Sequence, residues 1–155
     1  MSKIKYVTRH VEFEMAHLLP GYPGACMNLH GHSYKLEVAI YSANTNNDNP
    51  YGFIIDFKEL DAILKSVVPD HAFAYNKNTP AGSAEFEIAE VIKRQGLRYA
   101  EFDDVTSAEN MIEEIVSAVE SKLPIGLHVA RADLWETTNS HATWVSPEFM
   151  NISTK

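Results

Sequence analysis

The sequence predicts an α+β fold built on an antiparallel sheet, and three observations support this. Apolar and polar residues alternate along two segments near the start of the chain and along two more near its end. Between them, apolar residues recur at the spacing of amphipathic helices. The chain has 155 residues, 45% of them hydrophobic, which suits a single domain over residues 1–155.

The predicted sheet consists of four strands, two on either side of the helices. The first two are separated by a loop rich in Pro and Gly (20–28), and the second is followed by a polar loop (42–50). The four predicted strands are 4–19, 29–41, 126–136 and 140–145.

Two principal helices are expected between the strand pairs. Asp56 is placed to cap the first, which ends at Pro69. Thr106 and Glu109 fit a capping box at the start of the second, which ends at 124–126. A shorter helix (84–95) and a short strand (97–102) are expected between these two helices.

Charge and cysteine content narrow the class of protein. Thirteen Lys and Arg against 21 Asp and Glu give a formal charge of −8, which disfavours unspecific binding of nucleic acid or anionic membranes. Cys26 is the single cysteine, so no intramolecular disulfide can form and a reducing, cytoplasmic location is expected. Segment 1–5 lacks the apolar core of a secretory signal, and no apolar run is long enough for a transmembrane helix.

Three histidines predict a metal site. His30 and His32 lie two residues apart on a predicted strand, so both imidazoles face the same side. His17 lies on the core-facing side of the preceding strand, and antiparallel pairing brings it opposite them. Three neutral imidazoles with an open fourth position are typical of catalytic zinc. The alternative is that these histidines are surface residues or hydrogen-bonded core residues.

The single thiol and an Asp–His pair are further candidates. Cys26 lies four residues before His30, where a cation and imidazoles would favour a thiolate able to act as base or nucleophile. It could also be a fourth zinc ligand, or simply a small buried apolar residue. Asp70 and His71 fit a base and the group that orients it.

Glu136 lies at the end of the predicted strand 126–136, in phase with Ala130, Ala132 and Leu134, which are expected to face inward. A carboxylate facing inward would need N–H donors, such as those of a heterocycle. The alternative, which the residues alone favour, is that the strand has ended and Glu136 is solvated. The other three histidines outside these groups fit no cluster and are expected to be structural or on the surface: His10, His128 and His141.

Several motifs in order resemble those of the 6-pyruvoyl-tetrahydropterin synthase superfamily. They are FEMAH at 13–17, CMNLHGHSY at 26–34, GFIIDF at 52–57, DH at 70–71, TSAEN at 106–110 and WET at 135–137. Three residues separate Cys26 from His30-Gly31-His32, which is similar to the 6-carboxy-tetrahydropterin branch, whereas animal-type pyruvoyl enzymes have a longer gap.

The resemblance implies the tunnelling fold, with a four-stranded antiparallel sheet, two helices on one face and ring-shaped oligomers, often a hexamer of two trimers with active sites between subunits. It implies a zinc-dependent lyase that converts 7,8-dihydroneopterin triphosphate to 6-carboxy-5,6,7,8-tetrahydropterin, acetaldehyde and triphosphate, on the route to queuosine. The alternatives are a pyruvoyl-tetrahydropterin synthase or a side-chain-cleaving relative, and a non-catalytic zinc- or pterin-binding module.

The resemblance also assigns roles to residues. The zinc ligands would be His17, His30 and His32; the catalytic residues Cys26, Asp70 and His71; the pterin-binding residues Ser107, Glu109 and Glu136. The chain departs from the pattern at Leu18, where many relatives carry Arg. A basic partner for the triphosphate is therefore expected from a neighbouring subunit.

Overall fold

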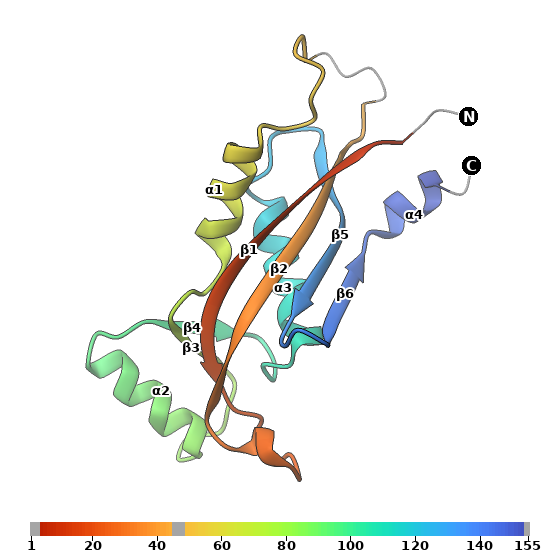
Figure 1. The fold of residues 1–155 in the computed structure, drawn as a ribbon. Coiled ribbons are helices and arrows are strands. Elements are labelled where there is room, and N and C mark those ends of the chain that lie inside the picture. The colour runs from red at the N-terminus through yellow and green to blue at the C-terminus, as the bar shows by residue number, and fades with distance from the viewer. Residues whose placement is uncertain (1–3, 45–48, 154–155) are drawn as a thin grey trace.

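Two long paired strands form the centre of the computed structural model, which describes residues 4–44 and 49–153 (Figure 1). β1 (Tyr6–His17) and β2 (His30–Ser42) run antiparallel, with His17 opposite His30. β2 also pairs antiparallel with β5 (Leu127–Trp135), and β5 with β6 (His141–Val145). These are the four strands that the alternation predicts.

The sheet has two further strands, so the expectation of four antiparallel strands is corrected to a mixed sheet of six. Its order is β4-β3-β1-β2-β5-β6. β3 (Ala72–Asn76) pairs parallel with the end of β1, and β4 (Tyr99–Phe102) pairs parallel with β3. β3 could not be predicted from alternating apolar and polar residues. Residues 72–75 are buried on both faces of the sheet, so the strand has no polar face.

Two helices cover one face of this sheet and enclose the main core (Figure 1). α1 (Phe57–Val67) begins at Asp56, whose carboxylate accepts from the Lys58 amide as predicted. α3 (Ala108–Glu120) begins at Ser107, whose hydroxyl accepts from the Asn110 amide. Thr106 is therefore not the N-cap, and the predicted capping box is wrong; Thr106 is buried instead.

The other face of the sheet is covered only near its ends. α2 (Ala84–Arg94) packs on Phe73 and Tyr75 of β3 through a small second cluster. α4 (Pro147–Ser153), which the sequence did not predict, places Phe149 on Tyr41. Tyr41 faces away from the main core by ordinary alternation along β2. The register shift between Ala39 and Ile40 leaves Ala130 of β5 unpaired and turns it to the same side as Tyr41, while Val129 stays in the core.

The sequence predictions reach beyond the described residues in two places. Residues 45–48 of the predicted polar loop lie outside them, as do residues 1–3 of the N-terminal segment. Within the described ranges, none of the helices has the length and apolar character needed to cross a membrane.

Candidate functional site

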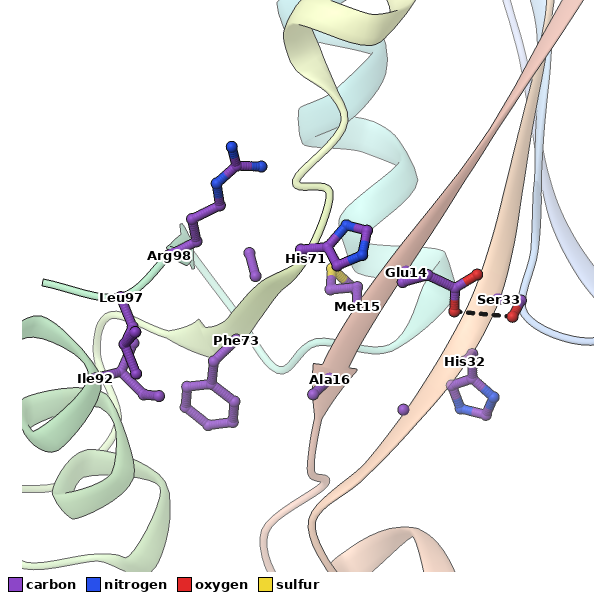
Figure 2. Close-up of a pocket in the computed structure, with 12 residues that line it drawn as sticks. Glu14, Met15, Ala16, His32, Ser33, His71, Phe73, Ile92, Leu97 and Arg98 are labelled. Atoms are coloured by element: carbon purple, nitrogen blue, oxygen red, sulfur yellow. Dashed lines mark hydrogen bonds between the residues drawn. The ribbon is translucent and has the colours of Figure 1, made fainter. Parts of the chain in front are cut away.

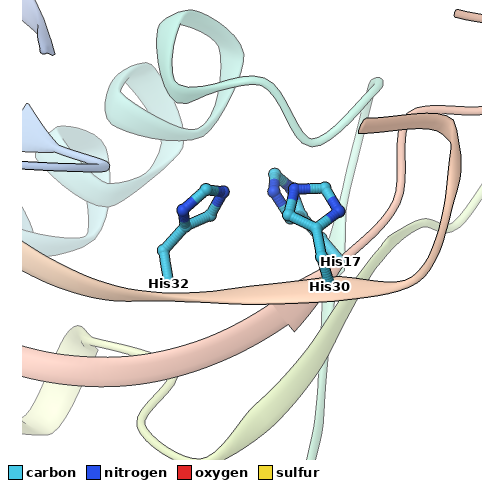
Figure 3. A group of neighbouring side chains, drawn as sticks. All are labelled: His17, His30 and His32. Atoms are coloured by element: carbon cyan, nitrogen blue, oxygen red, sulfur yellow. The ribbon is translucent and has the colours of Figure 1, made fainter. Parts of the chain in front are cut away.

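Three imidazoles meet where β1 ends and β2 begins (Figure 3). One ring nitrogen each of His17, His30 and His32 lies within 4.8 Å of the other two. His17 is completely buried and the other two are half-buried. The cross-strand register that joins His17 to His30 produces this convergence, as the sequence predicts.

Backbone carbonyls orient two of the rings. His17 Nδ1 lies 2.8 Å from the Thr106 carbonyl oxygen, and His30 Nδ1 lies 2.7 Å from that of Asn28. A carbonyl can only accept, so each Nδ1 carries the proton and each Nε2 keeps a lone pair. The Nε2 atoms of His30 and His32 are buried and have no hydrogen-bond partner. This donor set fits a metal ion.

The environment keeps these imidazoles in the form that binds metal. Burial lowers the pKa of His17 from 6.5 to about 4, against the opposing effect of its bond to Thr106. Burial also lowers the pKa of His32, although the Glu136 carboxylate acts in the opposite direction. Neutral imidazole is the metal ligand, so the site is prepared for a cation at neutral pH.

Gly31 allows the two strands to close at this point. A Cβ built on Gly31 would lie 3.2 Å from the Met15 carbonyl oxygen, which is tighter than almost all real contacts of this kind. A side chain at position 31 would therefore require the β1 backbone at Met15 to shift by a few tenths of an ångström.

Glu136 and Tyr34 complete the polar surroundings of the three rings. β5 ends at Trp135, yet the Glu136 side chain turns inward and is only 30% exposed, against the expectation of a solvated residue. Tyr34 donates a long hydrogen bond to Glu136 Oε1 at 3.4 Å, and its hydroxyl lies 3.3 Å from His17 Nε2. Burial, followed by Glu136 and Cys26, raises the pKa of Tyr34, so it stays a neutral donor.

Cys26 lies in the short helix η1 (Ala25–Met27) in the loop before His30. The loop is held to the end of β1, because the Leu19 amide donates to the Cys26 carbonyl at 2.8 Å. The thiol is half-buried and unbonded. Cys26 is the smallest of the effects that raise the pKa of Tyr34, whose hydroxyl lies 3.3 Å from His17 Nε2.

Asp70 and His71 form a pair, but in a different place. His71 Nδ1 lies 2.8 Å from Asp70 Oδ1, and the Glu14 amide, then His71, lower the pKa of Asp70. His71 adopts a left-handed backbone conformation, with φ of 56°. Within the described chain, no hydrogen bond or ion pair joins this pair to Cys26 or to the three histidines.

The imidazole of His71 faces an open groove of about 630 Å³ (Figure 2). Glu14 and Ser33, hydrogen-bonded to each other at 2.8 Å, line it together with His32, so the groove reaches one of the three histidines (Figure 2). Arg98, which the sequence did not single out, lines the same groove and donates to the Asp70 carbonyl at 3.2 Å. Arg98 reaches the groove because β4, which follows it directly, pairs with β3. The residues around Arg98 in the sequence therefore do not predict this position.

The remaining predicted substrate residues lie at the start of α3. Ser107 is engaged as the N-cap, and Glu109 is exposed in the first turn. Leu18, where relatives carry Arg, is buried against Phe73 and Tyr75 in the cluster beneath α2. An arginine there would lose the apolar contacts on which α2 rests.

Comparison with known proteins identifies the family. The 6-pyruvoyl tetrahydropterin synthase family profile matches residues 6–146. The chain belongs to this family. Solved structures with the same fold include a protein from Wolinella succinogenes (TM-score 0.71, 18% identity, 94% of this chain and 99% of that one). Another is the 6-pyruvoyl tetrahydropterin synthase of Caenorhabditis elegans (TM-score 0.63, 19% identity, 93% and 96%).

Within the 6-pyruvoyl tetrahydropterin synthase family, similar proteins carry the name of one branch. The chain is 32% identical to the 6-carboxy-5,6,7,8-tetrahydropterin synthase of Haemophilus influenzae, over 86% of this chain and 94% of that protein. It is 27% identical to the enzyme of that name from Rickettsia felis, over 85% and 94%. These relatives confirm the resemblance drawn from the motifs, and the chain is an enzyme of the lyase class.

Proposed function

We propose that the protein is a zinc-dependent 6-carboxy-5,6,7,8-tetrahydropterin synthase. It takes 7,8-dihydroneopterin triphosphate and water to 6-carboxytetrahydropterin, acetaldehyde and triphosphate, in the cytoplasm and on the route to queuosine. The observation that carries this is the convergence of His17, His30 and His32 in a chain that matches this family and keeps a free cysteine, Cys26, in the loop before His30.

The donor set favours zinc as the metal. His17, His30 and His32 would hold it through Nε2, since the Nδ1 atoms of the first two are engaged by carbonyls. Three imidazoles suit zinc in a catalytic site, where a further position stays available. When bound, zinc polarises the oxygens of the substrate side chain.

The residues of this chain would supply binding and proton transfer. Cys26 would exchange protons with the side-chain carbons, since it is a free thiol in the loop that leads into His30. His71, held by Asp70 at 2.8 Å, would exchange protons with the thiol. Glu136 would accept from the amino and ring N–H groups of the pterin, with help from Ser107 and Glu109 at the start of α3.

The position of the Asp70–His71 pair supports an active site shared between subunits. His71 is 70% exposed and lines a groove that also reaches His32, and within the described residues no hydrogen bond joins it to Cys26. Assembly into a ring, such as a hexamer of two trimers, would bring one subunit's pair to another's thiol. Arg98, in the same groove, would then be the cation that reaches the triphosphate.

Product identification tests the proposal. The zinc-loaded protein is incubated with dihydroneopterin triphosphate, and the products are identified by mass. A carboxypterin together with acetaldehyde is the expected result. A pyruvoyl product would assign the chain to the other branch of the family, and no turnover would leave a zinc- or pterin-binding module.

A further inference from the structure

Glu136 makes an unexplained approach to the candidate metal ligands. Its Oε1 lies 3.4 Å from His32 Nε2 and 3.5 Å from His17 Nε2. Both separations exceed the 2.7 to 3.2 Å usual for N–H···O hydrogen bonds, and neither pair is aligned as one. The carboxylate therefore lies beside the Nε2 atoms of His17 and His32 without a hydrogen bond of normal length to either.

The separations match those between neighbouring ligands of one metal ion. Zinc binds imidazole nitrogen at about 2.0–2.1 Å and carboxylate oxygen at about 2.0–2.2 Å in tetrahedral sites. Two such ligands are therefore about 3.3–3.5 Å apart across a tetrahedral edge. Glu136 Oε1 satisfies this spacing with respect to His17 and His32 but makes no such contact with His30, so it would move toward that ligand as the ion binds. The Nε2 atoms of His30 and His32 are also buried without a hydrogen-bond partner, as expected of atoms that bind a cation.

Tyr34 holds the carboxylate in this orientation. Its hydroxyl lies 3.4 Å from Glu136 Oε1, and the ring is fully buried and stacked on Phe13 at 5.2 Å, so the donor is rigid. The Glu136 amide donates to the Ser140 carbonyl at 3.1 Å and fixes the backbone. A side chain supported from both ends in this way is preorganised to ligate.

We propose that Glu136 is the fourth ligand of the metal in the pterin-free protein. This inference rests on the metal-binding part of the proposed function. Because the same carboxylate is expected to anchor the pterin, substrate binding would withdraw it from the metal and free a coordination position at the moment an oxygen of the substrate arrives. Without substrate the metal would be closed off by four protein ligands.

Zinc affinity of three full-length variants tests the proposal. Glu136→Gln removes the charge, whereas Glu136→Asp keeps the charge but shortens its reach by one methylene. Glu87→Gln, at an exposed position on α2, is the matched control. Affinity is measured by competition with a chromophoric chelator, and circular dichroism verifies that each variant is folded.

We expect both Glu136 variants to bind zinc at least about tenfold more weakly than the wild type, and the control to be unchanged. Weakening by Glu136→Gln alone would mean that the carboxylate acts only as a nearby charge, and would overturn the proposal. Equal affinity in all variants would also overturn it, while leaving the three-histidine site intact. Absence of zinc binding by the wild type would overturn this inference together with the metal site itself. A crystal structure of the zinc-loaded protein gives the direct check, because a ligating Oε1 must lie within about 2.2 Å of the ion.

Discussion

Acidification from pH 7 to pH 5 should destabilise the metal-free protein through His17. Burial lowers the pKa of His17 from 6.5, its value in the unfolded chain, to about 4 in the folded one. Between these values the unfolded chain binds more protons, so the free energy of unfolding falls as the pH falls. The stabilisation is fully present above 6.5 and is lost progressively toward pH 4.

The size of the effect follows from the two pKa values. At pH 5, protonation of His17 favours the unfolded chain by about 2 kcal/mol more than at pH 7. This is a large part of the stability of a small domain, which is typically about 5–15 kcal/mol. The lowered pKa of His32 adds to the loss in the same direction.

Urea unfolding of chelator-treated protein at both pH values measures this difference. His17→Gln should reduce the loss between pH 7 and pH 5, whatever it does to stability at pH 7. His10→Gln, at an exposed position on the same strand, should keep the wild-type loss. A loss of equal size in wild type and His17→Gln would show that His17 does not carry the pH dependence.

Three further substitutions have defined outcomes. Cys26→Ala should abolish turnover in the mass assay while zinc content stays at the wild-type level; loss of zinc would instead make Cys26 a ligand. Leu64→Ala should lower the free energy of unfolding in urea by about 2–5 kcal/mol, because Leu64 is fully buried. Leu97→Ala, at a position that is 56% exposed, should lower it much less. Similar losses in the two variants would contradict the assigned core. Asp56→Ala should cost about 0.5–2 kcal/mol through loss of the α1 cap, and an unchanged midpoint would show that the cap contributes nothing.

Local patterns were sufficient for much of the fold and for the metal ligands. The alternation of apolar and polar residues predicted β1 and β2. It also predicted that His17 faces the same side as His30 and His32. Side chains on a strand alternate between two faces, so the face of each histidine is determined once the core-facing side of both strands is known. Asp56 was found for a similar reason, since capping depends on neighbours in sequence.

Features set by distant packing were not predictable in this way. β3 is buried on both sides by α2 and the main core, and α4 is a short helix stabilised by Phe149 on Tyr41. Ser146 does mark its start, since its hydroxyl accepts from the Phe149 amide, but seven residues give no helical period. The inward turn of Glu136 depends on Tyr34, more than a hundred positions away in sequence.

The attachment of β3 has a consequence for dynamics. β1 pairs with β2 along its whole length, but β3 joins β1 only at Met15–Ala72 and Ala16–Phe73. α2 rests on a small cluster with Leu18 at the end of β1, whereas Ala74 of β3 lies in the main core, so α2 is suited to open before the strands beneath it. The His71 amide donates to the Glu14 carbonyl just before β3, so its exchange with deuterated solvent would report how often this attachment opens, independently of whether the histidine cluster is intact.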